Sequence, residues 1–378
     1  MKSYDAAIAG GGLIGGAIAL ELSRAGLRVA VFDRQEPGQE ASWASAGILS
    51  PAPENQGMIP LVPIGKMSLR LYPEFISQVE EISGQSTGYR PKGSLEALLA
   101  RAAREELSTL VALHRGLGLV CDPLRVEEAR ELEPALSEDV QAAALRPEEA
   151  TVDARALTKA VLEAARRSSA EIFPGTGVEA IWREGNRCSG VVTQAGKIAA
   201  GTTVIAAGCF SGGIEGAGVY APVQPAKGQM VALRSPAAKI ERVLWSERIY
   251  IVPRNDGRVL AGATVEYAGF DRTVTAEGIA SLLNAAIELV PALRGAEILQ
   301  TWAGLRPDSP DHLPILGPTD LDGLLMATGH FRSGILLAPI TARLLREWIT
   351  NKSVSIDVDR FSPLRFQQAS GAASRASR

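Results

Sequence analysis

Cysteine and histidine are scarce in this chain of 378 residues, which has three of each. Cys121, Cys188 and Cys209 are odd in number and widely spaced. That usage is typical of reduced thiols in a cytoplasmic protein rather than of a disulfide framework. No histidine pair has metal-ligand spacing with a cysteine, so the sequence predicts no metal site.

The chain also lacks an excess of positive charge. It has 39 Lys and Arg against 42 Asp and Glu, so it offers no basic surplus to neutralise a nucleic acid, and we expect no such partner. The apolar stretch at residues 6–20 contains five glycines and is followed at once by Glu21 and Arg24. These features argue against a signal peptide or a membrane span. Length and composition favour a soluble globular protein of two domains.

The first 34 residues have the pattern of a dinucleotide-binding unit. An apolar run at 4–9 precedes Gly10, Gly12 and Gly15 in the order G-x-G-x-x-G, a helical pattern follows, and a second apolar run ends on Asp33. The glycines permit a tight turn, close approach of backbone to a pyrophosphate, and close helix packing. The helix N-terminus favours phosphate, and Asp33 can accept a hydrogen bond from a ribose hydroxyl. The sequence therefore predicts an adenine dinucleotide site.

The remaining chain alternates helical and strand-like patterns. Helical periodicity is expected at 66–84, 98–118, 124–134, 153–168 and 275–293, and strands at 171–173, 178–182, 188–193, 203–208, 229–233, 248–252, 258–261 and 323–328. A last helix is expected to open at Ser333 and Gly334, where its N-terminal dipole could stabilise negative charge. The small residues at 42–51 suit backbone that passes close to a flat ligand.

Several segments together resemble one family. They are 10–16, 42–51, 250–254 (Tyr-Ile-Val-Pro-Arg), 302–307 (Trp-Ala-Gly-Leu-Arg-Pro) and 329–339 (Gly-His-Phe-Arg-Ser-Gly-Ile-Leu-Leu-Ala-Pro). In this order they resemble the flavin-dependent D-amino acid oxidase superfamily, and most closely its glycine oxidase branch from thiamine biosynthesis. The match extends over nearly the whole chain, and the last two segments are more specific than the glycine motif.

The resemblance implies a D-amino acid oxidase-like α/β fold. A Rossmann-like FAD-binding domain would comprise 1–84, 151–213 and 306–362, with an inserted β-rich (α+β) substrate-binding domain at 85–150 and 214–305. A flexible tail is expected over 363–378. FAD would be bound without a covalent link, because sarcosine-oxidase relatives attach it to a cysteine near 304–308 and no cysteine follows Cys209.

The resemblance also implies roles for individual residues. Tyr250 and Arg306 would hold the substrate carboxylate, Arg332 would lie near flavin and substrate, and Arg248 occupies a variable position that could touch substrate. Asp33 stands where many relatives have Glu. Together with the N-terminal motif, the predicted cofactor residues are Gly10, Gly12, Leu13, Ile14, Gly15, Asp33, Arg34, Ser42, Ala46, Gly47, Ile48, Leu49, Val178, Ala207, Gly208, Gly329, His330, Phe331, Arg332, Ser333, Gly334 and Ile335.

The implied reaction is oxidation of a small amino acid by FAD and oxygen, giving an oxo acid, ammonia or an amine, and hydrogen peroxide. Such hydride chemistry belongs to the cofactor and needs no dedicated acid–base residue. The sequence leaves several alternatives open: a broader D-amino acid oxidase, a dehydrogenase that reduces a quinone, an inert flavin-binding protein, and an NAD-dependent dehydrogenase. It ranks neither glycine, sarcosine and D-amino acids as substrates nor monomer against homo-oligomer.

Overall fold

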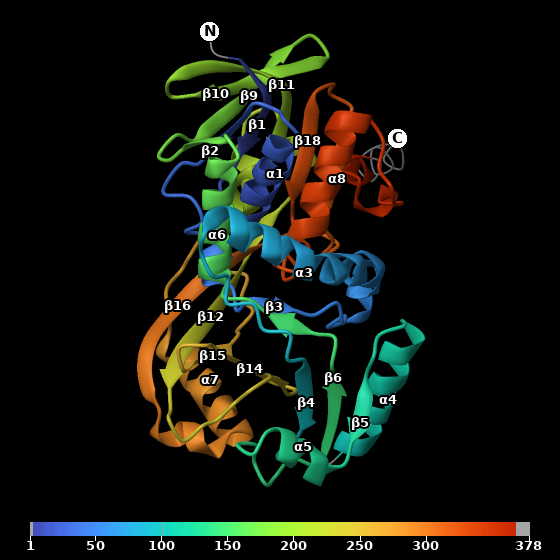
Figure 1. Ribbon diagram of the computed structural model, residues 1–378, viewed down its shortest axis with the longest axis vertical. Coiled ribbons are helices and arrows are strands. Elements are labelled where there is room, and N and C mark those ends of the chain that lie inside the picture. The colour runs from blue at the N-terminus through green and yellow to red at the C-terminus, as the bar shows by residue number, and fades with distance from the viewer. Residues whose placement is uncertain (1–2, 101, 368–378) are drawn as a thin grey trace, which may run out of the picture.

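The computed structural model describes residues 3–100 and 102–367. Two large sheets stand one beyond the other along the long axis of the molecule (Figure 1). The first sheet holds the N-terminal strand, and the second is built from the middle of the chain. A short pair of strands, β3 (Ile48–Leu49) and β7 (Ala150–Thr151), lies between them.

The first sheet has a parallel core. Its order is β17-β18-β11-β1-β2-β8, with β10 and β9 forming an antiparallel flap on β11. The bounds are β1 Ser3–Ala9, β2 Val29–Phe32, β8 Glu171–Phe173, β9 Val178–Glu184, β10 Arg187–Thr193, β11 Gly196–Ile205, β17 Ile315–Pro318 and β18 Leu324–Thr328. Strands β1 and β2 are almost wholly buried, as parallel strands covered on both faces must be. The expected Rossmann-like α/β arrangement is confirmed.

Four helices pack together beside this sheet. They are α1 (Leu13–Arg24), α3 (Val62–Ser83), α6 (Ala154–Arg167) and α8 (Ala338–Asn351), and each contacts two of the others. Alanines and glycines on the buried face of α1 let it pack closely on α6 and α8. The side chains of these helices and of β1 and β2 form the largest apolar core.

The second sheet is mostly antiparallel, in the order β16-β12-β15-β14-β13-β4-β6-β5. Its strands are β4 Ser94–Leu98, β5 Asp122–Leu124, β6 Ala142–Arg146, β12 Gln224–Arg234, β13 Val243–Trp245, β14 Tyr250–Pro253, β15 Arg258–Gly262 and β16 Glu297–Asp308. Helices α4 (Ala103–Gly116), α5 (Val126–Leu132) and α7 (Ala276–Leu289) accompany it. Strands β12 and β16 pair along nearly their whole length, which carries the end of β16 towards the first sheet.

Three sequence expectations about helices were wrong in their start. The helix expected from residue 66 begins at Val62. The helix expected from residue 98 begins at Ala103, because Ser94–Leu98 is a strand between β13 and β6, buried at all five positions. The helix expected to open at Ser333 and Gly334 begins at Ala338, one turn later. A backbone hydrogen bond from Leu337 N to Ser333 O closes an isolated turn before it.

Within the described ranges, no helix combines the length and apolarity that a membrane crossing requires. The three cysteines are buried and free. Of the expected tail, residues 368–378 lie outside the described residues. The preceding part packs on the protein, since Leu364 and Phe366 contact an apolar cluster and Arg365 pairs with Asp311 at 2.8 Å.

Asp153 connects α6, which lies beside the first sheet, to β15 of the second sheet. Its Oδ1 caps α6 by accepting hydrogen bonds from Arg155 N and Ala156 N, and its Oδ2 lies 3.2 Å from Arg258 Nη2 of β15. An N-cap is worth about 0.5–2 kcal/mol, and a half-exposed ion pair at most about 1 kcal/mol.

Replacing Asp153 therefore tests this connection between α6 and β15. We expect Asp153→Ala to lower the free energy of unfolding by about 1–2 kcal/mol. Asp153→Asn keeps the capping oxygen and should lose less than half as much. Urea denaturation of both variants measures the difference. Equal losses for Ala and Asn would show that the cap contributes nothing.

Candidate active site

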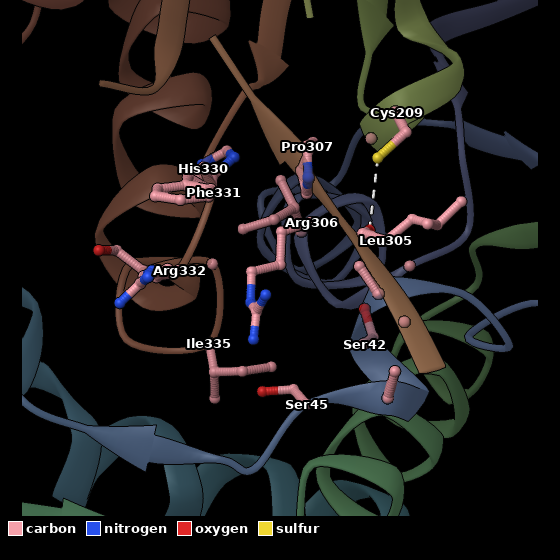
Figure 2. A pocket seen from close by; sticks show the side chains of 18 of the residues that line it. Ser42, Ser45, Cys209, Leu305, Arg306, Pro307, His330, Phe331, Arg332 and Ile335 are labelled. Carbon is pink, nitrogen blue, oxygen red and sulfur yellow. Dashed lines mark hydrogen bonds between the residues drawn. The ribbon is translucent and has the colours of Figure 1, made fainter. Parts of the chain in front are cut away.

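A large cavity lies where the two sheets meet. Its volume is about 1100 Å³, at the upper limit of what small-molecule and cofactor sites usually occupy. Its walls come from the turn after β1, the segment around α2 (Ala41–Ala44), the end of β11, the ends of β14 and β16, and the loop after β18. Figure 2 shows part of this cavity, with Arg306 near the centre of the view, Arg332 to its left, Ser42 to its right and Ser45 below.

The glycine-rich turn has no space for side chains at two of its positions. Gly10 has φ +109°, and a Cβ there would lie 2.4 Å from Ala206 O. A Cβ at Gly15 would lie 1.9 Å from Gly10 O, so the start of α1 can pack on the turn only as glycine. Gly10 and Gly12 line the cavity, whereas Gly15 lies behind them. Because the N-terminus of α1 faces this space, the turn fits a dinucleotide pyrophosphate.

Asp33 and Ser42 complete this end of the cavity. Asp33 Oδ2 accepts a hydrogen bond from Gly11 N at 2.8 Å, and Oδ1 accepts one from Gln35 N at 3.0 Å. Burial raises the pKa of Asp33, and these hydrogen bonds partly oppose the shift. Ser42 Oγ accepts a hydrogen bond from Leu13 N at 2.9 Å.

The second glycine-rich segment, residues 329–334, is tied to the end of β16. Phe331 N donates a hydrogen bond to Pro307 O at 2.9 Å, and Phe331 has φ +48°. His330 is buried and its Nε2 lies 3.1 Å from Thr341 Oγ1. Burial lowers the pKa of His330 to about 3, so its ring is neutral over the ordinary pH range.

Arg306 carries a guanidinium into the cavity from β16 (Figure 2). Its Nη1 donates to Thr264 O at 3.1 Å and lies 3.4 Å from Lys227 O. A Cβ at Gly228 on the paired strand β12 would lie 2.4 Å from both Nη1 and Nη2, so Arg306 lies over the backbone of a glycine. Among the described residues, no carboxylate pairs with Arg306.

Tyr250 lies near this guanidinium. A Cβ at Gly262, its partner on β15, would lie 3.0 Å from the Tyr250 hydroxyl, so a second glycine makes room for a cavity side chain. Burial raises the pKa of Tyr250, and the nearby positive charge of Arg306 partly opposes the shift. The phenol therefore stays protonated and available as a donor.

The other arginines proposed for the site are paired. Arg332 contacts Glu54, Arg248 contacts Glu288 of α7, and Arg34 lies 2.6 Å from Glu40. Arg332 and Arg34 still line the cavity, whereas Arg248 does not. Arg306 thus differs from these three in lacking a carboxylate partner within the described chain.

The structure brings most of the predicted residues to one cavity. Four do not line it: Gly15, Arg248, Leu49, which is buried in the apolar core, and Gly329, which packs on Ile315. Sequence reasoning missed several lining residues that no motif marks: Glu54, Met58, Glu96, Leu110, His114, Arg146, Cys209, Phe210, Met230, Trp245, Glu247 and Phe270. They come from separate segments, so only the folded chain reveals them.

Comparison with known proteins agrees with the dinucleotide site that the cavity geometry indicates. A model of the family described as DAO, FAD dependent oxidoreductase, matches residues 5–348. Glycine oxidase from Geobacillus kaustophilus is 35% identical over 366 residues, which cover 96% of this chain and 97% of that protein. Its crystal structure superposes with a TM-score of 0.91, covering 97% of this chain and 99% of the other.

A second relative is longer than this chain. The bifunctional protein ThiO/ThiG of Synechocystis sp. is 38% identical over 369 residues, which cover 96% of this chain and 54% of the relative. The chain therefore spans about half the length of that protein.

Proposed function

The chain belongs to the DAO family of FAD-dependent oxidoreductases, and from this premise we propose that it oxidises glycine and other small amino acids. The products would be an oxo acid, ammonia or an amine, and hydrogen peroxide, with oxygen as the electron acceptor. The similarity to glycine oxidase over nearly the full length of both chains supports this substrate class.

One observation carries the proposal. Arg306 presents a guanidinium to the cavity with no carboxylate partner in the described chain, and it does so beside a protonated phenol, Tyr250. A planar guanidinium binds a carboxylate through two parallel hydrogen bonds, which an ammonium cannot do. An inert flavin-binding protein would have no need of such a clamp.

The residues present fit FAD. Gly10, Gly12 and the start of α1 would hold the pyrophosphate, Asp33 the ribose, and the segments 42–48 and 330–335 the ring system. FAD bound there would supply the hydride-accepting and oxygen-reducing chemistry of the reaction. The chain's own residues orient the substrate: Arg306 and Tyr250 hold its carboxylate, and Arg332 lies to one side of Arg306 on the cavity wall (Figure 2).

None of the histidine, cysteine or tyrosine side chains on the cavity wall is poised to act as a base near neutral pH. Burial raises the pKa of Cys209 to about 12, and its Sγ lies 3.3 Å from Leu305 O. The pKa of His330 is held at about 3 and that of Tyr250 is raised. The substrate amine must therefore bind in its neutral form, or lose its proton without help from these groups.

We extend this proposal to the domains, the pathway and the cellular location. The first sheet with its helices would be the FAD-binding domain, residues 1–84, 151–213 and 306–362, and 85–150 with 214–305 the substrate-binding domain. The likeness to ThiO/ThiG supports a place in thiamine thiazole synthesis. Three buried free thiols support a cytoplasmic location.

A substrate panel tests the reaction. We expect the purified yellow protein to release hydrogen peroxide in air with glycine, sarcosine, D-alanine or D-proline, and its flavin to bleach with the same compounds without oxygen. Bleaching without peroxide, together with reduction of an added quinone, would identify a dehydrogenase. An absence of bleaching with every amine would contradict an enzymatic role.

The proposed binding of the substrate carboxylate can be tested by changing Arg306, or by changing Gly228, which leaves space for its guanidinium. Arg306→Lys keeps the charge but loses the paired hydrogen bonds, so we expect KM for glycine to rise at least tenfold, since such losses amount to about 2–5 kcal/mol. Gly228→Ala places a methyl group where the guanidinium lies and should raise KM in the same direction.

Gly295→Ala is the matched control, because a Cβ there meets nothing within 4 Å. An amine without a carboxylate should lose little in either Arg306→Lys or Gly228→Ala. If the loss were equal for that amine and for glycine, Arg306 would support the fold or the cofactor instead of the substrate.

The pH profile follows from the shifted pKa values. Because the pKa of His330 lies near 3 and that of Cys209 near 12, neither group changes charge between pH 5 and 10. We therefore expect the acidic limb of kcat/KM to move with the amine pKa of the substrate when glycine, sarcosine and weaker amines are compared. An acidic limb fixed across substrates and abolished by one substitution would reveal a protein base.

A further inference from the structure

The cavity continues beyond Tyr250 into a charged side pocket that no predicted motif marks. We call it the acidic arm and define it by Glu96 of β4, Leu110 and His114 of α4, Arg146 of β6, and Trp245 and Glu247 of β13 and the turn after it. All six line the same cavity as Arg306. The arm lies at the β4–β6 side of the second sheet, where Figure 1 shows α4 standing beside β6.

Ring contacts connect the arm to the clamp. Tyr250 meets Trp245 edge-to-face, with 5.3 Å between ring centroids. The Arg146 guanidinium carbon also lies over Trp245, 5.6 Å from the centroid of the indole ring. A substituent on the substrate that extends past Tyr250 would therefore enter the arm.

The arm holds more negative than positive charge. Arg146 is the single guanidinium of a buried cluster, and it contacts two carboxylates, Glu96 and Glu149, the latter at 3.4 Å. Glu149 does not line the cavity and also accepts a hydrogen bond from Ser94 Oγ at 2.5 Å. Glu247, exposed at the rim, adds a third carboxylate. Burial raises the pKa of Glu96; the charge of Arg146 opposes that shift, and Glu149 and Glu247 add to it.

Polar groups in the arm lack partners. Glu96 is 8% exposed, and its Oε2 contacts Arg146. Arg146 Nε and Trp245 Nε1 are buried without a hydrogen-bond partner in the described part of the chain. His114 is 3% exposed and its Nδ1 is also without a partner in that part of the chain. Burial lowers the pKa of His114 to about 4, so this ring is a neutral hydrogen-bonding group. Buried polar groups normally have partners, and such exceptions gather at functional sites.

We propose that the acidic arm is a subsite for the distal end of the substrate, selecting amino acids whose Cα or nitrogen substituent ends in an amine or another cationic group. The substrate carboxylate lies on Arg306, and the distal cation lies beside Glu96. The cation supplies the positive charge that Arg146 alone does not provide for two buried carboxylates. This inference rests on the proposed amino acid oxidation for the orientation of the substrate.

Ligand binding tests the arm without turnover. Titration of the FAD-loaded protein with 5-aminopentanoate and with pentanoate, followed by flavin absorbance, compares a distal cation with a methyl group at the same length. We expect the dissociation constant to be at least tenfold lower for 5-aminopentanoate, and glutarate to bind more weakly than either. Equal affinity for 5-aminopentanoate and pentanoate would mean that the arm holds water only and would overturn the proposal.

Variants test whether the preference for 5-aminopentanoate depends on Glu96 and on the space beside Leu110. Glu96→Gln should remove the preference for 5-aminopentanoate while acetate binds as before, and Glu105→Gln, an equal charge change on the exposed face of α4, should leave the preference intact. Leu110→Trp fills the arm without touching the ion pair, so both five-carbon ligands should bind at least tenfold more weakly. Should Glu96→Gln fail to fold, the wild-type preference and Leu110→Trp still decide the question.

Turnover separates this inference from the proposed function. N-(3-aminopropyl)glycine should be oxidised with at least tenfold higher kcat/KM than N-butylglycine, and Glu96→Gln should cancel that ratio, whereas Glu105→Gln should keep it. Peroxide from glycine with no cationic preference would overturn the arm alone. No turnover of any amino acid, with 5-aminopentanoate still bound tenfold better than pentanoate, would overturn the proposed reaction alone.

Discussion

The hydrogen bond from Phe331 N to Pro307 O is the contact on which the arrangement of the site depends. It ties the end of β16, an edge strand of the second sheet, to the loop that follows β18 of the first. Arg306 directly precedes Pro307, and Arg332 directly follows Phe331, so this one backbone contact fixes the position of one arginine relative to the other on the cavity wall. Strand β16 can reach this far because it pairs with β12 over eleven positions of register, from Gln224 opposite Asp308 to Arg234 opposite Glu297.

Close backbone approach is the second constraint, and it explains why glycine recurs at the cavity wall. Gly228 leaves the space that the Arg306 guanidinium fills, and Gly304 leaves space for Ala44, whose Cβ would lie 2.3 Å from a Cβ there. Gly228 and Gly304 are directly paired between β12 and β16, so they open the same face of this ribbon. One admits a functional side chain, and the other lets the segment around α2 pack on the strand. A strand with side chains at both positions would push these groups apart.

Sequence reasoning succeeded where the structure is local. The unit of β1, the glycine turn, α1 and β2 is continuous in the chain, so its spacing alone indicates the geometry that forms at Gly10 and Asp33. It failed where an isolated turn precedes a helix, because Ser333 and Gly334 resemble a helix start while Ala338 is the first helical residue. It could not find the acidic arm, whose wall joins β4, α4, β6 and β13, since nothing in the order of residues indicates that Glu96 and Arg146 become neighbours.

The two ends of the cavity differ in how their charges are paired. Arg306 keeps its positive charge at one end without a carboxylate partner in the described chain, whereas at the other end two buried carboxylates share Arg146. Burying an ion costs several kcal/mol unless partners compensate it, so neither end is an arrangement that stability alone would favour. Both are explained by a ligand that brings the missing charges, a carboxylate to Arg306 and a cation towards Glu96. A small zwitterion satisfies the first requirement, and only a longer substrate satisfies both.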